Sequence, residues 1–221
     1  MQSAGASHIR LIAWQSAIFF ACSTLGLIMT THDHEIVSVY GFSEAQINRL
    51  MEDAQECVLM WATRDSWPVG VTHAFVWKDG CVWLTFAEHR HRAEAIRRNP
   101  KVSIAVSGVA GTSPDCPRGA ATMKGLATFH GDQATKDWFY RALAKKVSPN
   151  SKEGEDAFFS LLDSPLRTIL KIVPEKWITY DQEKAGRDMA GQLSEDEKTP
   201  RASGDAVRMN KERARRGLPP R

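Results

Sequence analysis

The sequence predicts a mainly β protein of the α+β class, built as a small antiparallel barrel with peripheral helices. Three observations support this. Short apolar runs rich in β-branched and aromatic residues follow one another between residues 57 and 130, an Asp79-Gly80 turn joins two of them, and only one short helical segment stands among them. A parallel α/β sheet would instead alternate each strand with a helix, and this sequence does not.

The composition is that of an ordinary globular protein. The 221 residues suffice for one domain of roughly 150 residues and terminal extensions. The formal net charge of +3 is too small to predict a nucleic-acid partner. Cys22, Cys57, Cys81 and Cys116 have neither metal-site nor redox spacing, so we expect no metal, no structural disulfide and a reducing, cytoplasmic location. Cys57 and Cys81 lie in apolar runs and are expected to be buried thiols.

The apolar N-terminal segment has three interpretations that the sequence leaves open. Residues 11–29 read LIAWQSAIFFACSTLGLIM, which is nearly long enough to cross a bilayer, and Arg10 precedes them as in a signal peptide. Polar residues dilute this run, and no Ala-x-Ala cleavage site follows it. Residues 1–28 are therefore a translated upstream extension, a membrane anchor or a signal peptide, and membrane contact is expected only for the anchor.

The first folded elements are a helix and three strands. Ser43 and Gln46 form the pattern of a capping box, with Phe42 and Ile47 as its hydrophobic staple. Strands are predicted over 57–64, 69–77 and 81–87, and the last two flank the Asp79-Gly80 hairpin turn.

The remaining elements are three helices and three strands. A helix over 91–98 ends at Asn99-Pro100, because a residue that precedes proline disfavours helical geometry. Strands are predicted over 101–108, 119–131 and 176–181, with a loop at 108–118. Helices are predicted over 133–147 and over 155–173, the second interrupted at Pro165. Residues 185–221 are charged and have few apolar anchors, so they are predicted to be a mostly disordered tail.

Basic residues stand where the helix over 91–98 begins. The N-terminal end of a helix carries a partial positive charge and unpaired N–H groups, so cations are unfavourable there unless an anion accompanies them. Arg90, His91 and Arg92 occupy this position. The stretch therefore predicts an anion-binding site.

The stretch VWLTFAEHRHRAEAIRRNPKVSIAV resembles the strand, phosphate-binding turn and helix of the pyridoxamine 5'-phosphate oxidase-like, or FMN-binding split-barrel, superfamily. Members of that superfamily use FMN or the deazaflavin F420. The likeness extends to the first hairpin, to the strand MKGLATFHG and to the closing strand PEKWITYD. It covers residues 43–184 and implies an antiparallel split β-barrel that binds a cofactor.

The resemblance also implies roles for individual residues. Arg90 and Arg92 would hold the cofactor phosphate, with backbone N–H groups at His91. The full set of expected cofactor-binding residues is Thr72, His73, Thr85, Phe86, Arg90, His91, Arg92 and Lys124. FMN is the expected cofactor and F420 the alternative. No catalytic residue stands out, as an enzyme whose cofactor performs the chemistry allows.

Two functions follow from the resemblance. One is an FMN- or F420-dependent oxidoreductase acting on a small organic substrate, and the other is a non-catalytic flavin- or haem-binding storage or sensor protein. The signature that follows a tryptophan in true pyridoxamine-phosphate oxidases is missing, so pyridoxal phosphate synthesis is not expected.

A homodimer with the cofactor at the subunit interface is also expected from the resemblance. Trp61, Trp67, Trp77 and Trp83 crowd the predicted strands, which suggests that a partner buries some of them.

Overall fold

The computed structural model describes residues 35–221, of which 36–221 form one compact unit. The helices are α1 (Glu44–Asp53), α2 (His91–Arg98), α3 (Gln133–Val147), α4 (Lys152–Leu162), α5 (Gln182–Met189) and α6 (Asp205–Arg215), with 3-10 turns η1 (Gly108–Ala110) and η2 (Glu195–Glu197). The strands are β1 (Glu56–Ala62), β2 (Pro68–Ala74), β3 (Val76–Lys78), β4 (Cys81–Ala87), β5 (Lys101–Ser107), β6 (Gly119–His130) and β7 (Arg167–Asp181).

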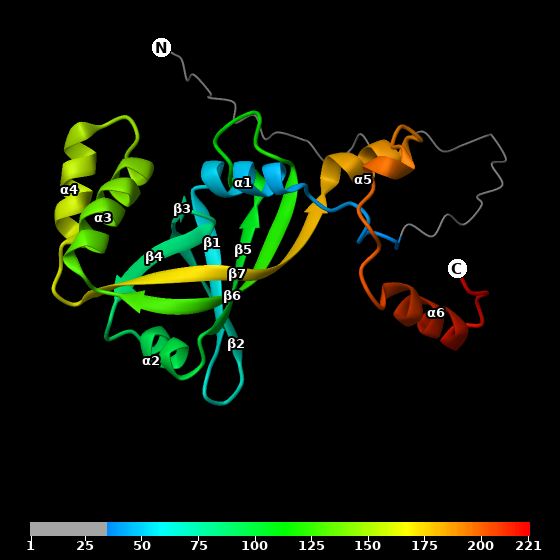
Figure 1. Ribbon diagram of the computed structural model, residues 1–221, viewed down its shortest axis with the longest axis horizontal. Coiled ribbons are helices and arrows are strands. Elements are labelled where there is room, and N and C mark those ends of the chain that lie inside the picture. The colour runs from blue at the N-terminus through cyan, green and yellow to red at the C-terminus, as the bar shows by residue number, and fades with distance from the viewer. Residues whose placement is uncertain (1–34) are drawn as a thin grey trace, which may run out of the picture. The chain divides into compact units, whose positions relative to one another are not determined.

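Within the part of the chain that the structure describes, seven strands form one sheet in the order β2-β1-β5-β6-β7-β4-β3. Every pairing is antiparallel, and the sheet curls into a half-barrel (Figure 1). A register shift between Lys124 and Gly125 interrupts the long β6–β7 ladder, and such bulges bend a strand. The predicted antiparallel split barrel with peripheral helices is confirmed.

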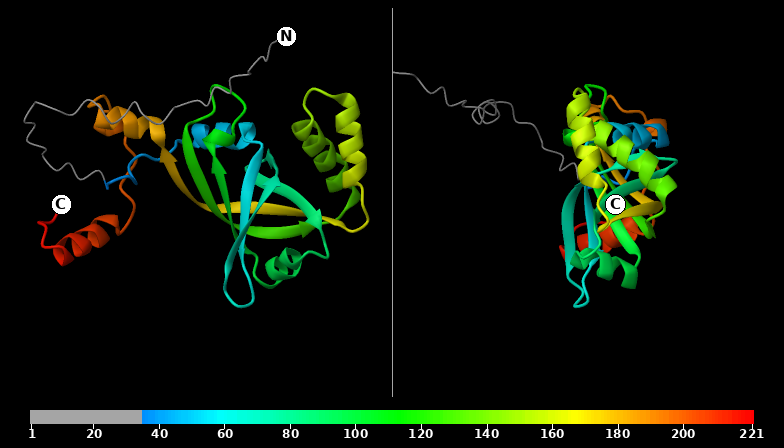
Figure 2. Two further views of the ribbon diagram at one scale, coloured as in Figure 1. Left: turned by 180° about the vertical axis from the view of Figure 1, so that it is seen from behind. Right: turned by 90° about the vertical axis from the view of Figure 1, so that its left-hand side faces the viewer.

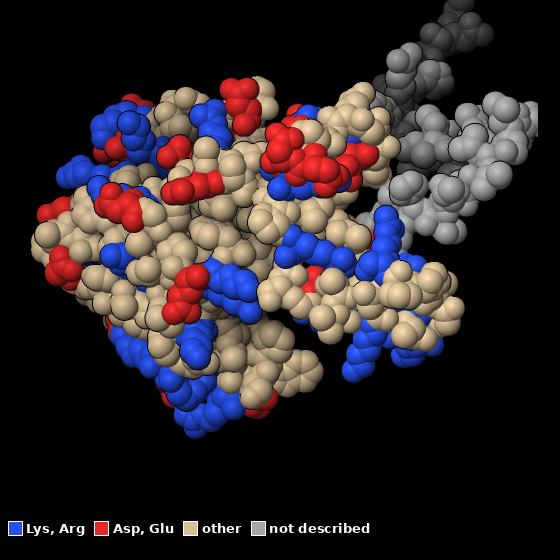
Figure 3. All heavy atoms as spheres, turned by 45° about the vertical axis from the view of Figure 1, so that its right-hand side comes forward, with Lys and Arg blue, Asp and Glu red and all other residues tan. Residues whose placement is uncertain are grey.

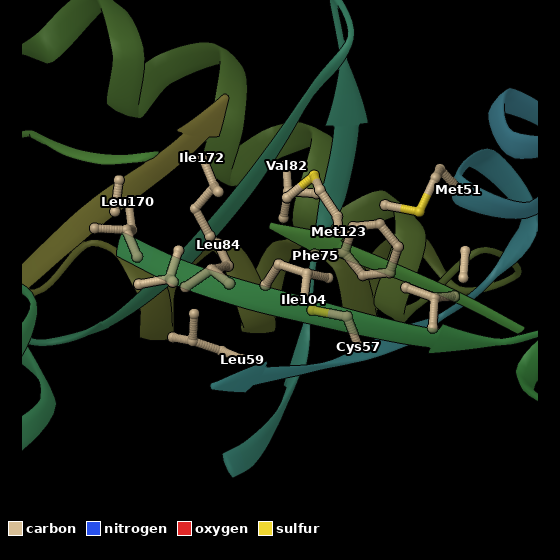
Figure 4. Close-up of a cluster of buried hydrophobic side chains, with 14 of the residues drawn as sticks. Met51, Cys57, Leu59, Phe75, Val82, Leu84, Ile104, Met123, Leu170 and Ile172 are labelled. Carbon is tan, nitrogen blue, oxygen red and sulfur yellow. The ribbon is translucent and has the colours of Figure 1, made fainter. Parts of the chain in front are cut away.

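The inner face of the curled sheet encloses the main hydrophobic core. Leu59, Leu84, Ile104 and Met123 come from four different strands, and each is 0 % exposed (Figure 4). Alternate residues of a strand point to opposite faces, so every second residue of each strand contributes its side chain to this core.

A second cluster covers the outer face of β4. Trp83 and Ile169 pack there against Phe139 and Tyr140 of α3, and the α3–α4 hairpin lies at this end of the sheet (Figure 2). Burial on both faces explains why the run Cys81–Phe86 is apolar almost throughout and lacks the alternation of a half-exposed strand.

Several local predictions are confirmed. Ser43 and Gln46 form both hydrogen bonds of the capping box. Lys78 pairs with Cys81 across a two-residue turn in which Asp79 and Gly80 have φ angles of 53° and 68°, as the favoured hairpin geometry requires. The helices α2 and α3 have the predicted bounds.

Two predicted elements are wrong. The single strand expected over 69–77 is divided at Phe75, which leaves the strand ladder and is 0 % exposed in the core. The helix expected over 155–173 ends at Leu162, and residues 167–173 begin β7 instead. Leu170 and Ile172 pack in the main core and Ile169 packs in the second cluster on the opposite face, so this run lacks strand alternation and resembles a buried helix in sequence.

The C-terminal residues have more regular structure than the disordered tail that we predicted for 185–221. The buried Asp181 caps α5 by accepting hydrogen bonds from the Glu183 and Lys184 N–H groups. Thr199 then accepts a hydrogen bond from the Gly41 N–H group and donates one to the Val39 carbonyl. This segment has few apolar side chains, and its regular structure is stabilised instead by the helix cap and by these hydrogen bonds.

The N-terminal predictions for residues 1–28, including the apolar segment 11–29, concern residues outside the described part of the chain. No helix among residues 35–221 combines the length and the apolar character needed to cross a membrane. Cys57 and Cys81 are buried, as expected.

Candidate cofactor-binding site

The site begins at the N-terminal end of α2. Arg90 is its N-cap residue and has extended backbone geometry, with no side chain accepting a hydrogen bond from the first turn. The turn therefore keeps N–H groups that no side chain caps, together with the partial positive charge of the helix end. Such a helix start is a natural binding position for an anion.

The acidic side chains nearest this helix in sequence are already engaged. Glu94 lies 3.3 Å from Arg64, and Glu88 is paired with Arg97. Arg90 and Arg92 form no ion pair with any residue of the described range. Within residues 35–221, Arg90 and Arg92 at the helix start therefore have no carboxylate partner that would compete with a phosphate.

Arg92 lies among aromatic side chains. Its guanidinium carbon is 5.7 Å from the ring centre of Trp61 and 5.5 Å from that of Phe86. Trp61 belongs to β1 and is 9 % exposed, and Phe86 stands near the end of β4. The aromatic faces attract the cation but leave its hydrogen-bonding capacity unused.

His73 of β2 provides one polar contact to Arg92. The Arg92 Nη1 and His73 Nε2 atoms are 2.5 Å apart. Because a guanidinium only donates, Nε2 must be the acceptor, and the ring proton therefore resides on Nδ1. Burial, then the charges of Arg92 and Arg167, lower the pKa of His73 to about 4. The imidazole is therefore neutral at physiological pH.

The charge of Arg92 itself is poorly compensated. Burial and the neighbouring Arg90 lower the pKa of Arg92. Five Lys or Arg residues and two Glu residues lie between positions 88 and 101. Lys and Arg atoms also gather over the end of the molecule where α2 lies (Figure 3). An anion bound here would offset the charge of Arg92 and the excess of positive charge around α2.

The structure brings together only some of the predicted site residues. His73, Phe86 and Arg92 are in contact, and Arg90 and His91 are exposed at the same helix start. Thr85 is 7 % exposed on the other face of β4, where its hydroxyl donates a hydrogen bond to the Thr168 carbonyl at 2.7 Å. This hydroxyl is already engaged within the chain.

Thr72 and Lys124 lie on the outer face of the sheet. Both are exposed, and Thr72 pairs with Val58 in the β1–β2 ladder. Lys124 lines a surface hollow of about 580 Å³ that also includes Trp61, Ser103, Thr122 and Glu175. Because Trp61 contacts both this hollow and Arg92, the two regions are adjacent.

The sequence interpretation missed two contributors. Trp61 precedes the turn by almost thirty positions and gave no signal of a role beside Arg92. Arg167 begins β7 opposite Ala87, and its charge contributes to the lowered pKa of His73. The expected helix over 155–173 concealed this cross-strand position.

The curled antiparallel sheet is that of a split-barrel protein. The family model described as pyridoxamine 5'-phosphate oxidase matches residues 43–181. The chain therefore belongs to the pyridoxamine 5'-phosphate oxidase family.

Three solved structures are similar to this chain. A conserved hypothetical protein from Mycobacterium tuberculosis is 19 % identical over 67 % of this chain and 91 % of its own, with a TM-score of 0.57. An F420 reductase is 21 % identical over 58 % of this chain and 92 % of its own, with a TM-score of 0.44. The haem storage protein HutZ from Vibrio cholerae is 14 % identical over 63 % and 97 %, with a TM-score of 0.46. The search of curated proteins gives no match.

The neutral His73 makes stability depend on pH. Its pKa falls from an ordinary 6.5 to about 4 on folding, so between these values the unfolded state binds more protons. We expect the free energy of unfolding to decrease as the pH falls from about 6.5 to 4. Urea denaturation of the wild type and of His73→Gln at about pH 7.5 and about pH 5 measures this, and His73→Gln should lose less stability between the two.

His91→Gln is the matched control for this experiment, because His91 is exposed at the start of the same helix. It should retain the pH dependence of the wild type. Equal pH dependence of the wild type and His73→Gln would contradict a neutral, buried His73.

Proposed function

We propose that the chain is an oxidoreductase that uses FMN, with the deazaflavin F420 as the alternative cofactor. The observation that carries the proposal is the half-buried Arg92, which has no carboxylate partner among residues 35–221 and lies at a helix start without a side-chain cap. FMN and F420 both present a phosphate group to such a site. Family membership supports the same kind of cofactor.

The residues at the helix start fit a phosphate. The Arg92 guanidinium can donate to phosphate oxygens while one of its N–H groups stays on His73, which fixes the direction of the side chain. Arg90 and the N–H groups of the first turn of α2 add further donors. Trp61 and Phe86 restrict water around the pair, which strengthens a charged hydrogen bond.

A bound flavin supplies hydride or electron transfer, and the protein supplies binding, orientation and access for the substrate. The hollow of about 580 Å³ beside Trp61 is of a size that accepts a small organic molecule. Its lining includes Lys101, Lys124 and Glu175, so it offers both charges to a polar substrate. We assign the substrate to this hollow.

We also propose that two copies of the chain enclose the cofactor. Leu126 and Val173 form one cross-strand pair on the outer face of β6 and β7, and Ile178 and Tyr180 lie further along β7 on that face. Their exposed fractions are 37 %, 44 %, 53 % and 38 %. Exposed apolar residues that share one face of a sheet are typical of an interface, and the Lys124–Lys176 pair lies between them on this face. A cofactor between two copies would also reach Thr72 and Lys124.

The crowding of tryptophans gives this dimer little support. Trp61 and Trp83 are 9 % and 8 % exposed within the single chain, and Trp77 is half-buried and donates to Asn48. Of the four tryptophans, Trp67 stays largely exposed, at 68 %. The case for an interface therefore rests on β6 and β7.

Cofactor binding is tested by titrating FMN and F420 separately into the purified protein, after mass analysis of any ligand released from it. Arg92→Ala should weaken binding of the preferred cofactor by about 1.5 to 3 kcal/mol, roughly a tenfold to hundredfold rise in Kd, because a charge-assisted hydrogen bond is lost. If a small acceptor molecule rapidly reoxidises the reduced cofactor on the protein, the protein is an enzyme. Slow reoxidation by oxygen alone indicates a carrier. A protein that binds neither cofactor would refute the proposal.

Arg98→Ala is the matched control, because Arg98 is exposed in the last turn of the same helix. It removes the same charge at the far end of α2 and should leave affinity nearly unchanged. Equal weakening by the two substitutions would show that general charge, and not a phosphate contact at Arg92, sets the affinity.

The oligomeric state is measured by light scattering with cofactor bound. We expect a dimer for the wild type and a shift toward monomer for Ile178→Glu, because a carboxylate would be buried in the proposed interface. Leu161→Glu, at an exposed apolar position of α4 away from β6 and β7, is the control for added negative charge. A monomeric wild type at micromolar concentration would contradict the dimer.

A further inference from the structure

A second hollow lies away from the Arg92 site, between α1, the loop after η1 and the end of α3. Its volume is about 750 Å³. The lining includes Glu52 and Asp53 at the end of α1, Thr112 of the loop, and Lys145 and Lys146 in the last turn of α3. The hollow is large enough for a small organic molecule.

Lys146 is the unusual side chain of this hollow. It is half-buried, and its Nζ atom lies 4.2 Å from the ring centre of Phe75, which is 0 % exposed. No carboxylate and no hydrogen-bond acceptor of the described chain partners the amine. A lysine amine in such a place loses hydration without gaining an ion pair, which favours its neutral form, although the Phe75 ring attracts the charged form.

The charged groups around Lys146 do not change this conclusion. Asp53 faces it from α1, but the Asp53 carboxylate accepts hydrogen bonds from the N–H groups of Thr112 and Ser113. Glu52 and Lys145 also line the hollow, with opposite charges. Burial lowers the pKa of Lys146 to about 8, with Cys57 and Asp53 acting in the opposite direction.

The thiol next to Lys146 is not a competing nucleophile. Cys57 on β1 is 2 % exposed, and burial raises its pKa to about 12. Nucleophilic reactivity of cysteine belongs to the thiolate, which this environment disfavours. Of the two side chains, the amine is therefore the group able to react at physiological pH.

We propose that Lys146 is a nucleophilic amine that forms imines with small aldehydes entering this hollow. The neutral Nζ atom attacks the carbonyl carbon, and the resulting carbinolamine loses water. A C=N bond replaces the C=O bond, and the carbonyl oxygen leaves in the water molecule together with the two amine protons. The step consumes no oxidant or reductant. The hollow admits the carbonyl compound, and the buried Phe75 ring lies against the amine on the side of the core.

The test is to treat the folded protein with propanal and cyanoborohydride at about pH 7.4 and to follow alkylation of each lysine by peptide mass mapping. At that pH about a fifth of an amine with a pKa near 8 is neutral, against about one in a thousand for an ordinary lysine. Lower basicity also lowers nucleophilicity, so we expect Lys146 to react at least about tenfold faster than Lys145. Lys145 lines the same hollow and is exposed.

Two variants and one denatured sample complete the experiment. Lys146→Arg keeps the cation and should abolish the fast adduct, whereas Lys145→Arg should retain it. In urea the difference between positions 145 and 146 should vanish, because it originates in the fold. Equal alkylation of the two lysines in the native protein, or a preference that persists in urea, would overturn the proposal.

Discussion

The candidate site depends on one uncompensated charge. Arg92 is held among Trp61, Phe86 and His73, and none of these side chains carries a negative charge at neutral pH. A partly desolvated cation without a counterion is costly, and the fold provides aromatic faces and a neutral imidazole that reduce this cost only partly. A phosphate would supply the missing charge.

The curvature of the sheet creates this arrangement. Trp61, His73 and Phe86 come from β1, β2 and β4, and β4 is separated from β1 and β2 by three strands in the order of the sheet. The rings of His73 and Phe86 nevertheless lie 6.0 Å apart, because the sheet curls until β2 approaches β4. The turn after β4 then delivers the start of α2 to the same place.

Much of the fold was predictable from the sequence because interactions between neighbouring residues determine these elements. The capping box at Ser43, the Asp79-Gly80 turn and the helix that ends before Pro100 are each specified by a few neighbouring residues. The division at Phe75 and the strand character of 167–173 are set by distant partners, which a local pattern does not contain.

The candidate site was predictable to a similar extent. Arg90 and Arg92 were noticeable because cations at a helix start are unfavourable. Trp61 and Arg167 were not, since only the curled sheet brings them near. The burial of Thr85 on the face covered by α3 was not predictable either, because the local sequence does not show which face of the sheet a threonine at the end of a strand occupies.

The most direct test of the central claim compares FMN with riboflavin, which differs from FMN only by lacking the phosphate. If the helix start and Arg92 bind the phosphate, FMN should bind at least about tenfold more tightly at low ionic strength, and the ratio should shrink as salt screens the charges. Equal Kd values for FMN and riboflavin at low salt would contradict the account.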